Sequence, residues 1–412
     1  MFFKLAIQSL LNRKGSVGLT IIAMSVSVFV LLGVEHLRNE TKESFNSTVS
    51  GTDLIVGART GSLNLLLYSV FRIGAPTNNV SWDTYRRVVA MERVAWSIPI
   101  SLGDSHQGYR VVGTTGDYFT HFSYGRKKNL KFLSGRPFLH VFDVVLGSEV
   151  AKELNYSIGS KVVLAHGLGK TSFSLHKNAP FEVVGILQPT GTPIDQSLQV
   201  SLLGMEAIHR NWKLTPALKD SPLNAKTFER KQFQPQNITA FMVGLDSKLA
   251  TFKVQRAINQ HMSEPLTAIL PGVALSELWQ MMSILENTLR LVSILILVAA
   301  LLGLSAMMLA SIRERRYEIY LLRVIGAPPI FVFLLIELEA LLISAFSIFI
   351  AALTLYLSLI GMDDFLASRY GLNISLNIMS ENNVLYAILI MFATAVAAAI
   401  PSFTAYKSVK QN

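Results

Sequence analysis

The sequence predicts a membrane protein with four transmembrane α-helices and a large α+β domain inserted between the first helix and the other three. Two observations predict this class. Of the 412 residues, 51% are apolar and 16% are charged, and the mean hydropathy is +0.41, which is high for a soluble protein of this size. Four long apolar segments account for this excess, whereas residues 35 to 285 are mixed polar sequence, long enough for their own core.

The first span, residues 15 to 34, has 20 residues without a charge, which suffices to cross about 30 Å of hydrocarbon. It is longer than the apolar part of a signal peptide, and no small-x-small cleavage site precedes Glu35. We therefore expect a retained anchor. Three further spans are predicted at residues 286 to 312, 329 to 361 and 384 to 406.

Residues 1 to 14 place four apolar side chains at helical spacing, with Lys4 and Arg13 beside them. The apolar positions are Phe3, Ile7, Leu10 and Leu11. This pattern predicts an elbow helix lying in the inner membrane surface. The alternative is an extension of the first span.

Basic residues near the span ends predict the orientation, because Lys and Arg stay on the cytoplasmic side. They gather before the first span, between the second and third, and in the tail at 407 to 412: Lys4, Arg13, Lys14, Arg313, Arg315, Arg316, Arg323, Lys407 and Lys410. The loop at 362 to 383 contains a single basic residue, Arg369. We expect cytoplasmic termini, a periplasmic inserted domain and a bacterial inner-membrane location.

The inserted domain alternates strand and helix patterns. Its ends, residues 35 to 50 and 272 to 290, are predicted to be helical stalks that extend the first and second spans. Residues 54 to 96 are predicted to be mostly helical, a helical insertion, and residues 97 to 200 to be short strands. Further elements follow after these: a helix at 202 to 212, a polar loop at 217 to 237, a strand at 237 to 245 and a helix at 249 to 261.

The stretch HGLGKTS, residues 166 to 172, contains the Gly-Lys-Thr of a phosphate-binding loop. Leu164 stands where that motif needs its first glycine, and the following residues alternate like a strand. A polar hairpin turn is the better interpretation. His166 and His176 flank it, either as a facing pair for a metal ion or as two of several dispersed surface histidines.

Net charge and composition exclude several classes. The charge of +10 is accompanied by no nucleic-acid-binding motif, so we expect no nucleic-acid partner and assign the charge to anionic lipid or an acidic protein. The chain has no cysteine, and no catalytic constellation stands out. We expect no enzyme, no metal and no cofactor on this chain.

Residues 313 to 328 predict an amphipathic helix between the second and third spans. Its basic side chains provide charge-assisted contacts to a cytoplasmic ATPase, and its apolar stripe fits a groove. The basic residues are Arg313, Arg315, Arg316 and Arg323, and the stripe is Ile319, Leu322 and Ile325. Gly326 is predicted to end the helix. The alternative is a positive-inside cluster without a partner.

Glu337 and Glu339 lie within the third span, where a carboxylate is costly and is usually functional or paired. Two residues apart on a helix, they point about 200° apart and form no paired acid site. A contact from Glu339 to a neighbouring helix is expected, with a proton relay as the alternative.

The stretch RERRYEIYLLRVIGAPP, residues 313 to 329, resembles the signature after the second span of FtsX-like permeases, a group that includes MacB, LolC and LolE. LAIQSLLNRKGSVGLT, VLGSEVAKELNYSIGSKVVL, FEVVGILQPTGTPID and AAAIPSFTAYKSVK resemble further segments over nearly the whole length. Glu314 and Glu318 belong to this signature, and Glu339 matches a Glu-Ala-Leu-Leu position of the third span. One departure is that Ser402 follows Pro401 where the family often has Pro-Ala-Arg-Arg.

The resemblance implies a permease subunit of an ABC transporter that moves a lipoprotein, amphiphile or peptide. Only fourteen residues precede the first span, so ATP and Mg²⁺ are expected on a separate ATPase chain. A homodimer or heterodimer with a similar permease is expected, as is a periplasmic adaptor or substrate protein. The alternatives are an FtsX-like complex that activates a periplasmic partner without transport, and a permease for uptake of a metal or small solute.

Overall fold

The computed structural model describes residues 2–125, 127–167, 176, 178–212, 234–315, 317–318, 321, 324–370 and 375–410. Two compact units make up the chain. The first, here called the helical bundle, comprises Met1–Glu40, Met282–Asp363 and Ile374–Asn412, and the second, the inserted domain, comprises Thr41–Met281 and Asp364–Asn373.

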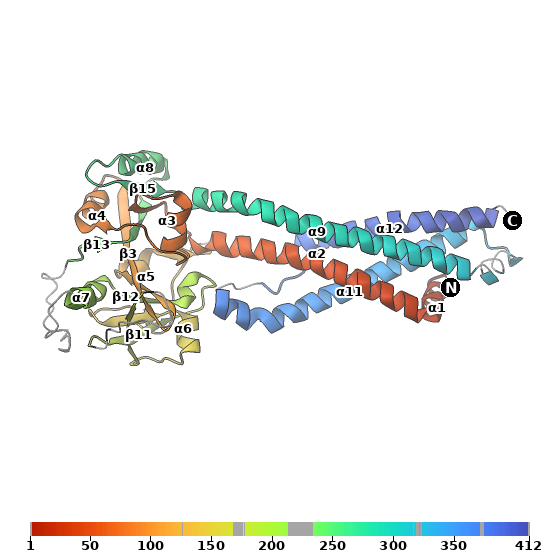
Figure 1. Cartoon of the computed structure of the whole chain (residues 1–412), viewed down its shortest axis with the longest axis horizontal. Helices are drawn as coiled ribbons and strands as arrows, with labels where there is room; N and C mark the ends of the chain where they lie inside the picture. Colours follow the sequence, from red (N-terminus) through yellow and green to blue (C-terminus); the bar gives the residue numbers. More distant parts are fainter. Residues whose placement is uncertain are drawn as a thin grey trace. The chain divides into compact units, whose positions relative to one another are not determined.

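Within the part of the chain that the structure describes, four helices are long and apolar enough to cross a membrane. They are α2 (Lys14–Thr48), α9 (Pro271–Glu314), α11 (Pro329–Tyr370) and α12 (Glu381–Lys410). Within the bundle they run alongside one another (Figure 1). The arrangement of one span, an inserted domain and three further spans is as predicted. The stalk segments are helical too, because α2 and α9 contain nearly all of their residues.

The bundle is apolar outside as well as inside. Its core contains side chains such as Met24, Leu304 and Ile343, each at most 1% exposed. On the outer faces, Phe349 and Phe392 are 61% and 68% exposed. A helix that is apolar all round needs apolar surroundings, so these outer faces suit lipid.

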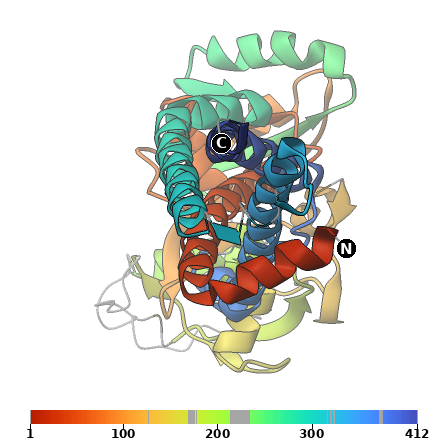
Figure 2. The same ribbon diagram turned by 90° about the vertical axis from the view of Figure 1, so that its right-hand side faces the viewer.

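Helix α1 (Phe2–Asn12) is separate from α2 and lies across the end of the bundle in Figure 2. Ala6 and Ser9 are buried, whereas Phe3, Ile7 and Leu11 are exposed. These three apolar side chains recur every four residues and form one stripe. This arrangement is that of an elbow helix, with one face on the bundle and an apolar face free for the membrane interface.

The described residues of the inserted domain form an eleven-stranded mixed sheet. Its main path has the order β15-β1-β14-β3-β4-β12-β8-β11-β7, while β10 pairs with β3 and β9 with β11. The strands are β1 (Leu54–Ala58), β3 (Val94–His106), β4 (Tyr109–Thr114), β7 (Phe132–Gly135), β8 (Asp143–Leu146), β9 (Lys161–Val162), β10 (Ala165–His166), β11 (Phe181–Leu187), β12 (Ser197–Ser201), β14 (Ala240–Leu245) and β15 (Leu266–Ile269).

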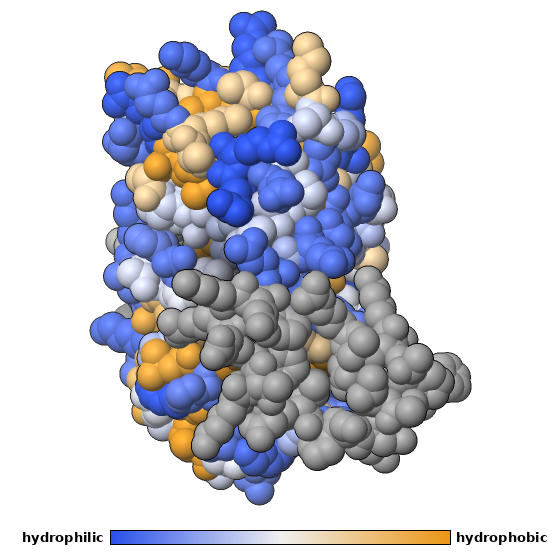
Figure 3. Space-filling model, turned by 90° about the vertical axis from the view of Figure 1, so that its left-hand side faces the viewer, coloured by the Kyte–Doolittle hydropathy of each residue, from blue (hydrophilic) through white to orange (hydrophobic). Residues whose placement is uncertain are grey.

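Short pairs and helices complete this domain. The pairs are β2 (Val80–Ser81) with β13 (Asn237–Ile238), and β5 (Ser123–Tyr124) with β6 (Lys128–Asn129). The helices are α3 (Ser62–Ser69), α4 (Trp82–Val89), α5 (Asp117–His121), α6 (Ser148–Glu153), α7 (Leu202–Trp212) and α8 (Thr251–Asn259), with 3₁₀ turns at Pro193–Gln196 and Lys248–Ala250. Helices α4 and α8 lie near β15, and α6 and α7 near β11 and β12 (Figure 1). The face of this domain in Figure 3 is mainly hydrophilic.

The prediction of a mostly helical segment at 54 to 96 is only partly right, because the segment contains the helices α3 and α4 but also strands at both ends. Residues 54–58 form β1, an interior strand of the sheet, and β3 begins at Val94. All five residues of β1 are buried, with Ile55 in one core and Leu54 and Val56 in another. A strand buried on both faces lacks polar alternation, so its short apolar run resembles a buried helix. The later helices at α7 and α8 are confirmed, and the polar loop falls mainly outside the described residues.

Candidate coupling site and a histidine cluster

Glu339 of α11 is the centre of a polar network in the bundle. Its carboxylate is 1% exposed and accepts a hydrogen bond from Ser9 Oγ at 2.5 Å. Arg13 Nη2 binds Oε2 at 2.9 Å, and Arg315 Nη1 binds Oε1 at 3.0 Å. A buried carboxylate is tolerated when it is paired and hydrogen-bonded, and Glu339 satisfies both conditions. The predicted contact from Glu339 to its neighbours is thus present.

The network joins three parts of the chain. Arg13 lies between α1 and α2 and also donates to Ser311 near the end of α9. Arg315, just after α9, uses its Nε to bind Glu318 at 2.8 Å. The start of the predicted coupling segment is therefore connected through one carboxylate to the first span and the third. The guanidinium of Arg315 is turned into the bundle, and its role as a direct ATPase contact stays a prediction.

The other predicted coupling residues have different surroundings. Arg313 and Glu314 end α9 and are exposed, and Ile325 is 83% exposed. Gly326 has φ +99°, a backbone conformation that suits glycine at a helix end. Arg316, Ile319, Leu322 and Arg323 lie outside the described residues.

Sequence reasoning missed three exposed apolar side chains near this segment. Tyr317 is 73%, Val324 66% and Leu321 42% exposed. With Ile325 they form what we call the coupling surface, Tyr317, Leu321, Val324 and Ile325. The missed signal was the three further apolar residues between the charged positions of the motif.

Glu337, two residues before Glu339 on α11, is half-buried. Among the described residues, the Glu339 carboxylate contacts Ser9, Arg13 and Arg315, and Glu337 is not among its partners. The expectation that these carboxylates form no paired site agrees with this geometry.

A second ion-pair network, not predicted from the sequence, ties α2 to α9. Glu35 is 1% exposed and binds Arg290 Nε at 2.6 Å and Arg38 Nη1 at 2.8 Å. Arg38 Nε also binds Glu286 at 2.8 Å. The first and second spans are therefore held together by alternating charges, each carboxylate contacting at least one arginine.

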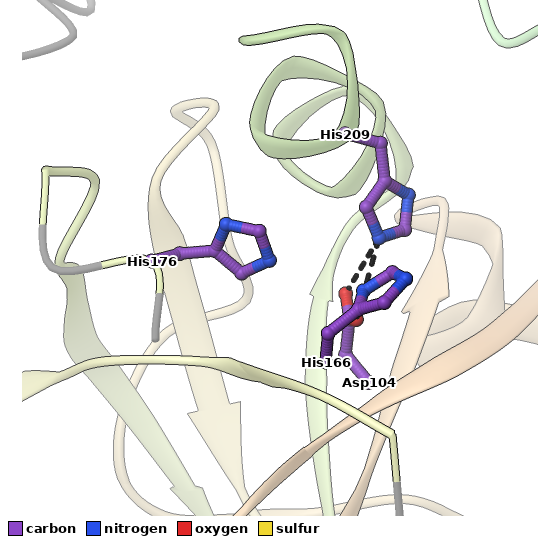
Figure 4. Close-up of side chains that lie close together, drawn as sticks. All are labelled: Asp104, His166, His176 and His209. Atoms are coloured by element: carbon purple, nitrogen blue, oxygen red, sulfur yellow. Dashed lines mark hydrogen bonds and ion pairs between the residues drawn. The ribbon is translucent and has the colours of Figure 1, made fainter. Parts of the chain in front are cut away.

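The inserted domain contains a cluster of one carboxylate and three imidazoles. Asp104 of β3 is fully buried, and His166 Nδ1 lies 2.9 Å from its Oδ1. His209 Nε2 lies 3.1 Å from its Oδ2. Figure 4 shows His209 on α7 and His166 directed at Asp104, with the ring of His176 facing the same point from another side. One ligand atom from each of the four lies within 4.8 Å of every other.

Local backbone features bring these side chains together. The pairing of β3 with β4 shifts register between Leu102 and Ser105, and Gly103 has φ +153°. Such a β-bulge turns a side chain away from its regular direction. Beside the bulge, β10 pairs with β3 so that His166 lies opposite Asp104. From the sequence, His166 and His176 were either a facing pair or two of several dispersed surface histidines, and neither Asp104 nor His209 was predicted to join them.

The environment of the cluster sets two pKa directions. Burial raises the pKa of Asp104, but the His209 hydrogen bond and the neighbouring imidazoles outweigh it and leave the pKa below its ordinary value. Burial lowers the pKa of His176, which favours its neutral form. Neutral imidazole and ionised carboxylate are the forms that bind metal ions.

Comparisons with known proteins agree with this architecture. A family model described as MacB-like periplasmic core domain matches residues 17–261, and one described as FtsX-like permease C-terminal matches residues 290–410. A search of curated proteins found no match.

Two solved structures are similar to the chain. One is the periplasmic region of MacB from Actinobacillus actinomycetemcomitans, with 11% identity, 56% of this chain and 94% of that chain covered, and TM-score 0.36. The other is the extracellular domain of the noncanonic ABC-type transporter YknZ from Gram-positive bacteria, with 12% identity, 53% and 99% covered, and TM-score 0.31.

The two family models cover most of the chain, one over the first span and inserted domain and one over the last three spans. Together with the four apolar helices they define a transmembrane permease of the ABC transporter class. The chain belongs to the family of MacB-like and FtsX-like ABC transporter permeases. A permease subunit of this family is not itself the catalytic subunit.

Proposed function

We propose that the chain is the permease subunit of a MacB/LolCE-type ABC transporter, which transmits ATP-driven motion of a separate ATPase subunit to the inserted domain. That motion moves a lipoprotein, an amphiphile or a peptide out of the inner membrane or periplasm. The observation that supports this best is the Glu339 network. It connects Arg315, in the segment expected to meet the ATPase, with Arg13 and α11.

The coupling step starts at residues 313–326. The coupling surface exposes apolar area beside the charged Arg313 and Glu314, a combination that suits a groove with an apolar floor and charged rim. ATP and Mg²⁺ bind to the partner ATPase. Movement of the segment pulls on Arg315 and, through Glu339, on the first and third spans.

The helices α2 and α9 then carry the movement along their length. Each is a single continuous helix, and the Glu35 network holds the two together. A rigid paired element of this kind provides the two-state coupling that mechanical transmission requires. The work is delivered to the inserted domain without a substrate passing through the bundle.

The location follows from charge. The Lys and Arg residues around the coupling segment and both termini favour a cytoplasmic position for these parts and a periplasmic position for the inserted domain. A second copy or a similar permease completes a dimer, and a periplasmic adaptor or substrate protein is a further partner.

The experiment is co-purification of the full chain from membranes of its own host, with mass spectrometry to identify any retained ATPase with a phosphate-binding loop. The test variant combines Val324→Glu and Ile325→Glu. The matched control combines Leu249→Glu and Phe252→Glu, which are 95% and 71% exposed on the inserted domain.

We expect wild type and control to retain the ATPase, and the test variant to lose at least about tenfold, since two charges facing an apolar groove are costly. Equal retention by all three chains, or an absent ATPase in wild type, contradicts the proposal.

A further inference from the structure

The Asp104 cluster lies in the inserted domain and takes no part in the coupling proposed above. Its four side chains come from separate places in the chain: β3, β10, the residue His176 and helix α7. His209 and His166 contact Asp104 across 105 and 62 residues of sequence. The fold thus brings together three imidazoles and a fully buried carboxylate that lie far apart in the sequence.

The distances among Asp104, His166 and His209 are close to those of a tetrahedral metal site. With Zn–N and Zn–O bonds of about 2.1 Å, neighbouring ligand atoms in a tetrahedron lie about 3.4 Å apart. Asp104 Oδ1 lies 2.9 Å from His166 Nδ1 and 3.3 Å from His209 Nε2. A small outward shift of these two imidazoles lets an ion take the place between them.

The ring arrangement leads to the same geometry. Imidazoles on one tetrahedral zinc ion have ring centres about 5 Å apart. The centres of His166 and His209 are 5.1 Å apart, and those of His176 lie 6.0 and 6.1 Å from them. The three rings are inclined to one another by 65° to 85° rather than stacked. His176 has to approach by about 1 Å to complete the set.

The carboxylate of the cluster is buried, whereas two of its imidazoles are partly exposed to solvent. Asp104 is fully buried, and its position at a β-bulge fixes the anionic ligand. The side chains of His166 and His209 are 54% and 30% exposed, which leaves an entry path from solvent. A site with a rigid floor and accessible outer ligands can exchange its ion without unfolding of the sheet.

We propose that Asp104, His166, His176 and His209 bind a divalent transition-metal ion, with Zn²⁺ as the ion that best suits a tetrahedral His₃Asp site. Three nitrogens and one carboxylate oxygen are borderline ligands that favour Zn²⁺ over Mg²⁺ or Ca²⁺. Four protein ligands fill the coordination shell, so the ion has a structural or regulatory role and no open position for catalysis. It fixes helix α7 and His176 to the edge of strand β3.

The test uses the full chain in detergent, purified through a tag free of histidine and treated with chelator. Zn²⁺ binding is measured by titration calorimetry, and Co²⁺ binding by visible absorption, whose intensity separates tetrahedral from octahedral sites. The variants are Asp104→Asn and His209→Gln, and the control is His140→Ala, an exposed histidine of the same domain.

We expect one tight Zn²⁺ per chain and a tetrahedral Co²⁺ spectrum in wild type and in the control. Each variant should weaken Zn²⁺ binding by more than about 100-fold, the upper end for substitutions outside the ligand shell. Zn²⁺ should raise the Tm of wild type and leave the Tm of a folded His209→Gln chain unchanged. No tight Zn²⁺ in wild type, or equal binding by wild type and both variants, overturns the proposal.

Discussion

Two buried carboxylates, Glu339 in the bundle and Asp104 in the inserted domain, are compensated in different ways. Glu339, 1% exposed, contacts the guanidinium groups of Arg13 and Arg315. Asp104, fully buried, contacts the imidazoles of His166 and His209. Arginine is always charged in proteins, whereas histidine changes charge in the physiological range and binds metals when neutral.

The difference indicates two kinds of task. A carboxylate between two permanent cations makes a joint that holds under all physiological conditions, as a mechanical linkage requires. A carboxylate among imidazoles has partners that can exchange a proton for a metal ion. Glu35 follows the first pattern, because Arg38 and Arg290 both contact it. The bundle thus uses arginine where helices must stay joined.

The largest effect is expected from Glu339→Gln. It leaves Arg13 and Arg315 without their shared counter-charge, and breaking a buried pair in this way costs about 3–5 kcal/mol. Far-UV circular dichroism during titration with a denaturing detergent measures the loss of helix. Glu337→Gln is the control on the same helix and should cost under about 1 kcal/mol. Equal destabilisation by both variants would remove the special position of Glu339.

A smaller effect is expected from Asp104→Asn in the metal-free chain. The imidazoles lose charge-assisted hydrogen bonds but leave no permanent charge behind, so the cost is about 1–3 kcal/mol. All four tryptophans, at positions 82, 96, 212 and 279, belong to the inserted domain, so their fluorescence reports its unfolding. A cost above that of Glu339→Gln would contradict the contrast between the two carboxylates.

The smallest effect concerns a third, partly exposed carboxylate. Glu264 accepts hydrogen bonds from Ser81 N and Oγ at 3.0 and 2.7 Å, beside the start of α4. Burial by itself raises the pKa of Glu264. The hydrogen bonds lower the pKa by more than burial raises it, so the pKa lies below the ordinary value of 4.5. Its contribution is therefore complete above pH 4.5 and is lost as the pH falls through the folded pKa.

The corresponding variant is Glu264→Gln, with Glu182→Gln as an exposed control. Tryptophan fluorescence at pH 7 should show a loss of about 0.5–1 kcal/mol for Glu264→Gln, and the gap to wild type should close as the pH falls through the lowered pKa of Glu264. A gap that is constant from pH 7 to pH 3 would show that ionisation of Glu264 is irrelevant.

Local patterns explain which features the sequence could predict. The four spans and the coupling segment are recognisable because long apolar runs and clustered arginines are contiguous. The strand β1 was misread because burial on both faces removes its alternation. Asp104 and His209 were missed because a β-bulge and a strand pairing, rather than spacing, bring them to His166. The partners of Glu35 depend in the same way on how α2 packs on α9.

The most direct test of the coupling account is ATP hydrolysis by the purified chain, alone and with its co-purified ATPase. We expect no hydrolysis by the chain alone, hydrolysis by the complex, and loss of the complex in the Val324→Glu and Ile325→Glu variant. Hydrolysis by the chain alone that Lys170→Ala abolishes would contradict the account, because HGLGKTS would then be a phosphate-binding loop.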